Sequence, residues 1–136
     1  MKLLLLLALS ISAGAQEYAL KEVIKVLCIV ESDGDSKAIG DNGKAHGLLQ
    51  IHPIMVKECN RLLGRDEFTL KDRFSPSQSK YMATVFLSRQ ISLYVKQCGK
   101  YPDELTLANS WNTGRIFSNQ NLKYRNRYKT KKEFER

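Results

Sequence analysis

The chain has 136 residues, a formal net charge of +8 and 43% hydrophobic residues. This length fits one compact domain with a core of its own, and a sequence without repeats, low-complexity tracts or linkers excludes a second domain. The positive excess favours a polyanionic partner, which is nucleic acid, an anionic membrane surface or a cell wall rich in carboxylate and phosphate.

The first residues follow the pattern of a secretory signal peptide. Lys2 gives a positive start, Leu3–Ile11 an apolar core, and Ala13–Ala15 a cleavage site of small residues. The apolar core is too short to span a bilayer, and no later stretch is long enough. We therefore expect a signal peptide over residues 1–15 and a domain over residues 16–136 that is exported, periplasmic or secreted, without an integral membrane span.

Positive charge is concentrated near the C-terminus. Eight Lys or Arg residues lie between Arg115 and Arg136, against Glu133 and Glu135 only. Because an exported protein rarely meets nucleic acid, we expect no nucleic-acid partner, and the cell wall matches this charge better.

Hydrophobic spacing and end signals predict a helical chain. The predicted helices cover about residues 18–32, 53–63, 76–98, 102–113 and 121–134. The clearest start is at Ser75 and Pro76, where the serine caps the helix, the proline takes its first position and Gln78 completes a capping box. Gly64 and Gly99 are placed to end two of these helices in the left-handed conformation.

The segments between the helices predict loops. Residues 32–46 carry glycines among Asp and Asn residues, which is turn chemistry, and residues 65–74 indicate a polar loop. Residues 48–51 fit either a short strand or an extended turn, because periodicity cannot distinguish these over so few positions. The predicted fold class is all-α, or α+β at most, with a small β element beside the first helix.

One glutamate lies on the apolar face of the first predicted helix. Leu20, Ile24, Leu27 and Glu31 follow one another at four, three and four residues, so they share one helical face. Desolvation on an inward face favours the protonated carboxyl and raises its pKa, as a general acid near neutral pH requires. The alternative is that Glu31 merely ends the helix and turns outward to water.

The three cysteines and two histidines indicate no metal or cofactor site. Cys28 lies on the predicted core helix and is expected to be a small buried residue, which leaves Cys59–Cys98 as the expected disulfide. His46 and His52 have a spacing that matches no metal-ligand pattern, so we expect them in a loop or cleft.

Four short motifs occur in order along nearly the whole mature chain. They are Glu31-Ser32, Gly47-Leu48-Leu49-Gln50-Ile51-His52-Pro53, Trp111-Asn112-Thr113-Gly114, and Tyr124. In this order they resemble the lytic transglycosylases of the soluble, goose-lysozyme-like type, in the small form found in bacteria and phages. Each motif alone is weak, but the ordered set is specific.

The resemblance implies a lysozyme-like fold and cleavage of the β-1,4 bond between N-acetylmuramic acid and N-acetylglucosamine in peptidoglycan glycan strands. Glu31 would be the sole catalytic carboxyl, first protonating the glycosidic oxygen and then taking the proton of the C6 hydroxyl as a 1,6-anhydro ring closes. The N-acetyl oxygen of the substrate would replace a second carboxylate. A monomer without cofactor or metal is implied.

The resemblance also implies a set of substrate-binding positions. These are Ser32, Gly47, Leu48, Gln50, His52, Trp111, Asn112 and Tyr124. Gln50 would either offer its amide to sugar hydroxyls or hold the loop, and Leu48 and Leu49 would wall the pocket of Glu31. For Trp111 its spacing favours a core position over a sugar platform. Tyr124 would either place its hydroxyl near Glu31 or the N-acetyl group, or pack one face of the last helix.

Two competing functions stay open at this point. Hydrolysis, as in goose-type lysozymes, needs a carboxylate that activates water, and Asp33, Asp35 and Asp41 all lie in the loop near Glu31. A non-catalytic lysozyme-like module that binds wall glycan through its basic face is the other reading.

Gly40 stands where many relatives carry a serine, which removes one hydroxyl contact to sugar.

Overall fold

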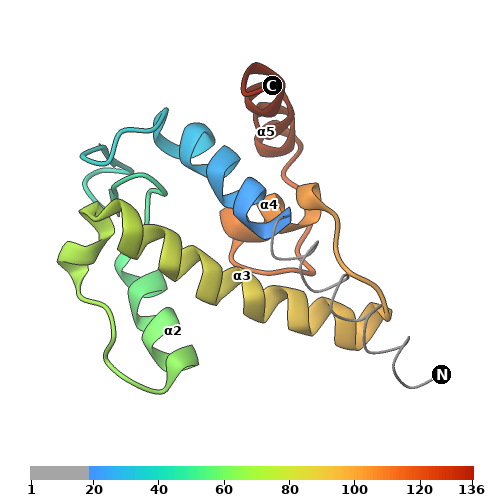
Figure 1. Cartoon of the computed structure of the whole chain (residues 1–136), viewed down its shortest axis with the longest axis horizontal. Coiled ribbons are helices and arrows are strands. Elements are labelled where there is room, and N and C mark those ends of the chain that lie inside the picture. The colour runs from blue at the N-terminus through green and yellow to red at the C-terminus, as the bar shows by residue number, and fades with distance from the viewer. Residues whose placement is uncertain (1–18) are drawn as a thin grey trace, which may run out of the picture.

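The computed structural model describes residues 19–136, so the predicted signal peptide over residues 1–15 lies outside the described residues. The described chain starts in a helix that covers residues 19–32. The elements that follow are β1 (Ile39–Gly40), β2 (Ala45–His46), α2 (Pro53–Leu63), a 3-10 helix (Leu70–Phe74), α3 (Pro76–Cys98), α4 (Glu104–Thr113) and α5 (Leu122–Phe134). This mostly helical arrangement with one very small sheet confirms the predicted lysozyme-like fold class (Figure 1).

The long helix α3 is the scaffold of the molecule. It packs against α2, α4 and the 3-10 helix, and it contributes Met82, Phe86 and Leu87 to the core. The predicted ends of α3 are confirmed, because the Ser75 hydroxyl caps the backbone N–H of Gln78 and a left-handed glycine follows Cys98. The second half of the predicted capping box is wrong, since the side-chain oxygen of Gln78 is buried without a hydrogen-bond partner.

The small β element lies earlier in the chain than predicted. Strands β1 and β2 pair antiparallel within the segment predicted as loop, with Ile39 opposite His46. Of the stretch predicted as strand or turn, residues 47–50 form turns and Ile51 makes a single bridge to His46. Strands of two residues are too short to produce an alternating pattern, which explains why the sequence does not reveal them.

The segment over residues 65–74 is only partly a loop. Its second half is the 3-10 helix, which starts at a cap in which the Asp72 carboxylate accepts from the backbone N–H of Thr69 at 2.7 Å. Arg73, one residue before the end of this helix, is buried and donates to the backbone carbonyls of Lys44 and Ile51, 3.1 and 3.2 Å away. Through these two hydrogen bonds the 3-10 helix holds the segments on either side of β2 in place.

The predicted Cys59–Cys98 disulfide is wrong, and all three thiols are free. Cys59 is fully buried, and its thiol donates to the carbonyl of Met82 at 3.4 Å; burial raises the pKa of this thiol to about 12. Cys98 lies 16 residues beyond Met82 on the same helix, which places it about 24 Å further along the axis at 1.5 Å per residue. That separation far exceeds the reach of a disulfide.

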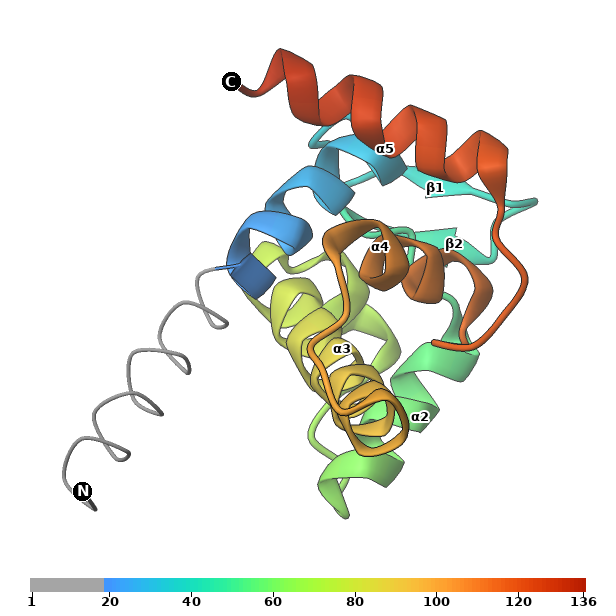
Figure 2. The ribbon, with the colours of Figure 1, turned by 90° about the vertical axis from the view of Figure 1, so that its right-hand side faces the viewer.

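The last helix closes against the first. Figure 2 shows α5 lying across the end of the helix over residues 19–32 and beside β1. Two buried tyrosines, Tyr124 and Tyr128, attach α5 to the core, and the Lys131 ammonium pairs with Asp33 at 2.5 Å. Within residues 19–136 no helix is both long and apolar enough to cross a membrane.

Candidate active site

Glu31 lies in the last turn of the first described helix. The three apolar residues of its predicted face, Leu20, Ile24 and Leu27, are all buried, so the periodicity identifies the inward stripe correctly. The Glu31 carboxyl is half-buried, and the hydroxyl of Tyr124 donates to its Oε1 atom at 2.5 Å. Of the alternatives expected for Tyr124, a hydroxyl near Glu31 is therefore present.

The surroundings of Glu31 change its acidity. Burial raises its pKa above the ordinary value of 4.5, while the hydrogen bond from Tyr124 and the positive charge of Arg127 act in the opposite direction. The desolvation effect is the largest, so the carboxyl keeps its proton to higher pH than an exposed glutamate. Burial and the nearby carboxylate also raise the pKa of Tyr124, which keeps its hydroxyl protonated as a donor.

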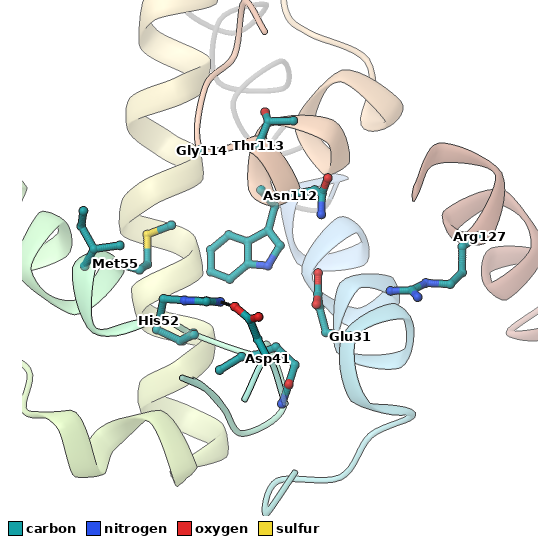
Figure 3. A pocket seen from close by; sticks show the side chains of 13 residues that line it. Glu31, Asp41, His52, Met55, Asn112, Thr113, Gly114 and Arg127 are labelled. Carbon is teal, nitrogen blue, oxygen red and sulfur yellow. Dashed lines mark ion pairs between the residues drawn. The ribbon is translucent and has the colours of Figure 1, made fainter. Parts of the chain in front are cut away.

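Glu31 opens onto a cavity of about 520 Å³ (Figure 3). Figure 3 shows the loop residues Asp41 and His52 on one side of this cavity, Glu31 on the helix side, and Arg127 reaching in from α5. The cavity is lined by Glu31, Asp41, Ala45, Gln50, Ile51, His52, Ile54, Met55, Trp111, Asn112, Thr113, Gly114 and Arg127. Its lining thus combines a half-buried acid, Glu31, and an exposed one, Asp41, with apolar and hydrogen-bonding side chains, as ligand sites commonly do.

A hydrogen-bonded loop joins the hairpin to α2 and fixes the wall next to Glu31. The Ser32 hydroxyl donates to the carbonyl of Leu48 at 2.8 Å, which ties the end of the first helix to this loop. The Gln50 amide donates to the carbonyls of Ala38 and Gly47, at 3.3 and 3.0 Å. Gln50 therefore holds the loop while it also lines the cavity.

The structure divides the predicted substrate-binding residues into two groups. Four of them line the cavity of Glu31: Gln50, His52, Trp111 and Asn112. Ser32, Gly47, Leu48 and Tyr124 do not, although Tyr124 contacts Glu31 directly and lines a second cavity. Leu49, the other residue predicted to wall this pocket, is fully buried in the core. Ala45 and Ile51 provide the apolar wall instead.

Gly47 makes a close approach to protein rather than to the cavity. It has a φ of 80° and is buried, and a Cβ atom at this position would collide with the backbone carbonyl of Arg73. A glycine is therefore required here by the packing of two backbones.

The core position favoured for Trp111 is confirmed, and the side chain also reaches the cavity. It is 8% exposed and packs edge-on against Phe86 in the core, yet it also lines the cavity. Its neighbour Asn112 is exposed at the rim, where its side-chain oxygen accepts from Asn121 at 2.9 Å.

Sequence reasoning missed two parts of the site. Arg127 was not singled out, because it is one of many basic residues in the last helix and only its position on the helix distinguishes it. The pairing of Asp41 with His52, 3.1 Å apart, was missed too, although Asp41 was considered as a base for hydrolysis. The signal in the sequence is the turn Asp41-Asn42-Gly43, in which Asp41 takes a left-handed φ of 49° that Asp tolerates.

The described residues contain no group of three or more His, Cys, Asp or Glu side chains that is able to hold a metal ion. In comparisons with known proteins, the family model described as "Transglycosylase SLT domain" matches residues 8–134, which is nearly the whole chain. No curated protein and no solved structure matches the chain.

Proposed function

Because the chain belongs to the transglycosylase SLT domain family, whose members cleave peptidoglycan as lytic transglycosylases do, we propose a specific reaction for it. The enzyme cleaves the β-1,4 bond between N-acetylmuramic acid and N-acetylglucosamine without water and leaves a 1,6-anhydro end. We further propose that it acts as an exported monomer on the glycan strands of the cell wall, as its signal-peptide pattern and positive charge suggest.

The observation that carries this proposal is the state of Glu31. The carboxyl is half-buried with a raised pKa, it holds a hydrogen bond from Tyr124, and it opens onto a cavity large enough for sugar rings. A carboxyl that keeps its proton to higher pH than an exposed glutamate is better able to give it to a glycosidic oxygen.

The proposed steps use one protein carboxyl twice. Glu31 donates its proton to the bridging oxygen, the bond from that oxygen to C1 of the muramic acid ring breaks, and the N-acetyl carbonyl oxygen of the same ring stabilises the positive charge at C1. The Glu31 carboxylate then takes the proton of the C6 hydroxyl as its oxygen bonds to C1. The carboxyl is reprotonated at the end, so the cycle needs no cofactor.

Tyr124 has a positioning role in these steps. Its hydroxyl fixes one oxygen of Glu31 and, since it remains protonated, stabilises the carboxylate formed after the first proton transfer. Gln50 keeps the loop wall next to Glu31 in place through its two hydrogen bonds to loop carbonyls.

Product analysis tests the proposal. We expect wild-type protein incubated with purified sacculi to release muropeptides with 1,6-anhydro ends, identified by mass spectrometry. Replacement of Glu31 by glutamine keeps the size of the side chain but removes the transferable proton, and should lower the rate at least about 100-fold. A glycan-binding module without catalysis is the conclusion if wild-type protein releases nothing.

A hydrolytic outcome is the second candidate, and one observation favours it. Asp41 lines the same cavity as Glu31 and is paired with His52, so a second carboxylate is available to activate water. Reducing ends from the wild-type enzyme, together with a loss of activity in Asp41→Asn, would establish hydrolysis. Anhydro ends that persist in Asp41→Asn support the transglycosylase.

A further inference from the structure

The cavity beside Glu31 contains a cation that lowers the pKa of Glu31 through its charge but has no hydrogen-bonding role in the proposed steps. Arg127 lines the cavity of Glu31 and also a second cavity of about 240 Å³. This second cavity is lined by Asn112, Asn121, Lys123, Tyr124 and Arg127. Since Asn112 and Arg127 belong to both linings, the two cavities adjoin, and a ligand over Glu31 is able to extend past Arg127 towards α5.

The hydrogen-bond donors of Arg127 are not used by the protein. Elsewhere on α5, Lys131 pairs with Asp33 and Lys132 with Glu104. The Arg127 guanidinium makes no hydrogen bond or ion pair with any residue from 19 to 136, and only its charge acts on Glu31 and Asp33. It lies 5.7 Å from the centroid of the Tyr124 ring. Stacking over this buried ring restricts the plane of the guanidinium while its edge stays exposed.

These features match one kind of ligand. A planar guanidinium with free donors fits a carboxylate through two parallel hydrogen bonds, and the ammonium of Lys123 adds a second positive charge in the same cavity. Figure 3 shows Arg127 reaching from α5 towards Glu31, so a group that is bound here belongs to a sugar close to the reacting bond.

We propose that Arg127, with Lys123 beside it, forms a subsite for a carboxylate carried on the lactyl side chain of the muramic acid residue. That carboxylate is either the free lactyl group or an acid group of the attached stem peptide. The inference rests on the proposed function, in which the muramic acid ring lies over Glu31. Its lactyl branch, which starts from C3 of that ring, extends into the adjoining groove.

This subsite would make Arg127 a specificity-determining residue. A polymer of N-acetylglucosamine has the same linkage but no lactyl branch, so it would gain nothing from the guanidinium. The unpaired cation would then favour peptidoglycan over chitin-like glycans through one charge-assisted contact.

Binding measurements on a cleavage-deficient background test the inference. In Glu31→Gln protein, Kd is measured by calorimetry for three ligands: an uncharged N-acetylglucosamine oligomer, a peptide-free peptidoglycan strand with lactyl carboxylates, and a strand that bears stem peptides. Adding Arg127→Met should weaken binding to carboxylate-bearing strands about tenfold and change the Kd of the uncharged oligomer less than twofold. The glutamine background removes any effect of Arg127 on the ionisation of Glu31.

Lys129→Met is the matched control. It removes one positive charge from the same helix, but a separation of two residues turns Lys129 about 200° away from Arg127, and Lys129 lines neither cavity. Its Kd values should equal those of the background, and thermal melts should show that both variants are folded.

The pattern of losses identifies the source of the carboxylate. A loss confined to the peptide-free strand indicates the lactyl group, and a loss confined to the peptide-bearing strand indicates the stem peptide. An equal loss for the uncharged oligomer, or an equal loss in Lys129→Met, overturns the subsite. Cleavage of sacculi by the wild-type enzyme tests the proposed function separately, so an active enzyme with Arg127-independent binding would refute this inference alone.

Discussion

Burial and hydrogen bonding change the pKa of Glu31 in opposite directions, and burial is the larger effect. Because burial removes water from this carboxyl, its ionised form lowers the stability of the folded protein. The same property that suits Glu31 for proton donation is therefore a cost in stability, as is common at active sites.

Glu31→Gln should therefore stabilise the protein at neutral pH. The folded pKa of Glu31 lies above the unfolded one, so the wild-type free energy of unfolding decreases as pH rises from about 4.5 through the raised value, and stays low above it. Glutamine has no such dependence and still accepts the hydrogen bond of Tyr124. We expect a higher melting temperature for the variant at pH 8 and a smaller difference at pH 4.5, measured by thermal unfolding. A difference that grows towards acid pH would contradict this account.

Tyr124 and Tyr128 offer a comparison of two buried hydroxyls on one helix face. Tyr124→Phe removes the donor to Glu31 and should lower activity about 10- to 100-fold, because a hydrogen bond to a charged group contributes about 1.5–3 kcal/mol. Since that bond lowers the pKa of Glu31, its loss should also move the pH–rate profile to higher pH.

Tyr128→Phe is the control for this prediction. Its hydroxyl is buried with no partner among the described residues, so its removal should leave activity unchanged and stabilise the fold, by up to about 1–3 kcal/mol. Equal losses of activity in the two variants would show that Tyr124 acts only through packing.

At the level of elements, the turn after β2 depends on one close contact between backbones. Gly47 and Gly43 have similar φ values of 80° and 85°, but a Cβ at Gly47 meets the Arg73 carbonyl, whereas a Cβ at Gly43 meets nothing within 4 Å. The two glycines therefore separate the effect of backbone strain from the effect of collision.

Gly47→Ala should destabilise the protein more than Gly43→Ala. Alanine at Gly43 suffers only the left-handed conformation, at a cost of about 1–2 kcal/mol, while alanine at Gly47 also forces the 3-10 helix away, for about 1–3 kcal/mol more. Urea unfolding measures both values. We also expect Gly47→Ala to lose activity, because the displaced loop carries Gln50; equal destabilisation of the two variants would exclude the close contact.

The sequence predicts those elements whose ends carry local signals. Helix α3 has its cap at Ser75 and its glycine at the far end, and α2 ends at Gly64 as expected. The hairpin at residues 39–46 has strands of two residues each, so it is defined by contacts that the sequence does not display. The predicted Cys59–Cys98 disulfide is wrong because the sequence does not show where along α3 the helix α2 packs. Cys59 on α2 lies against Met82, far from Cys98 at the end of α3.

The candidate site is predictable to the extent that each of its residues belongs to one of the family motifs. The motifs place Glu31, Gln50, Trp111 and Asn112 together, and these four line one cavity. Arg127 belongs to no motif, and only the direction in which α5 crosses the molecule brings it to that cavity.

At the scale of the whole molecule, α5 is attached to the body by apolar burial and by exposed ion pairs. Tyr128 is fully buried, whereas the Lys131–Asp33 pair is exposed to solvent. Exposed pairs contribute little to stability, while a buried aromatic side chain contributes several kcal/mol.

Tyr128→Ala should therefore cost about 3–5 kcal/mol, and Lys131→Met less than about 1 kcal/mol. Chemical denaturation of both variants measures the difference. A large loss in Lys131→Met would mean that charge, rather than apolar packing, holds the last helix.

The hydrogen bond between Glu31 and Tyr124 joins residues that are 93 positions apart. A ribosome that has reached position 120 has already made the acid but not the hydroxyl that orients it, and the helix that covers the acid is still missing. We therefore expect a chain that ends before α5 to lack both the hydroxyl that orients Glu31 and the helix that covers it.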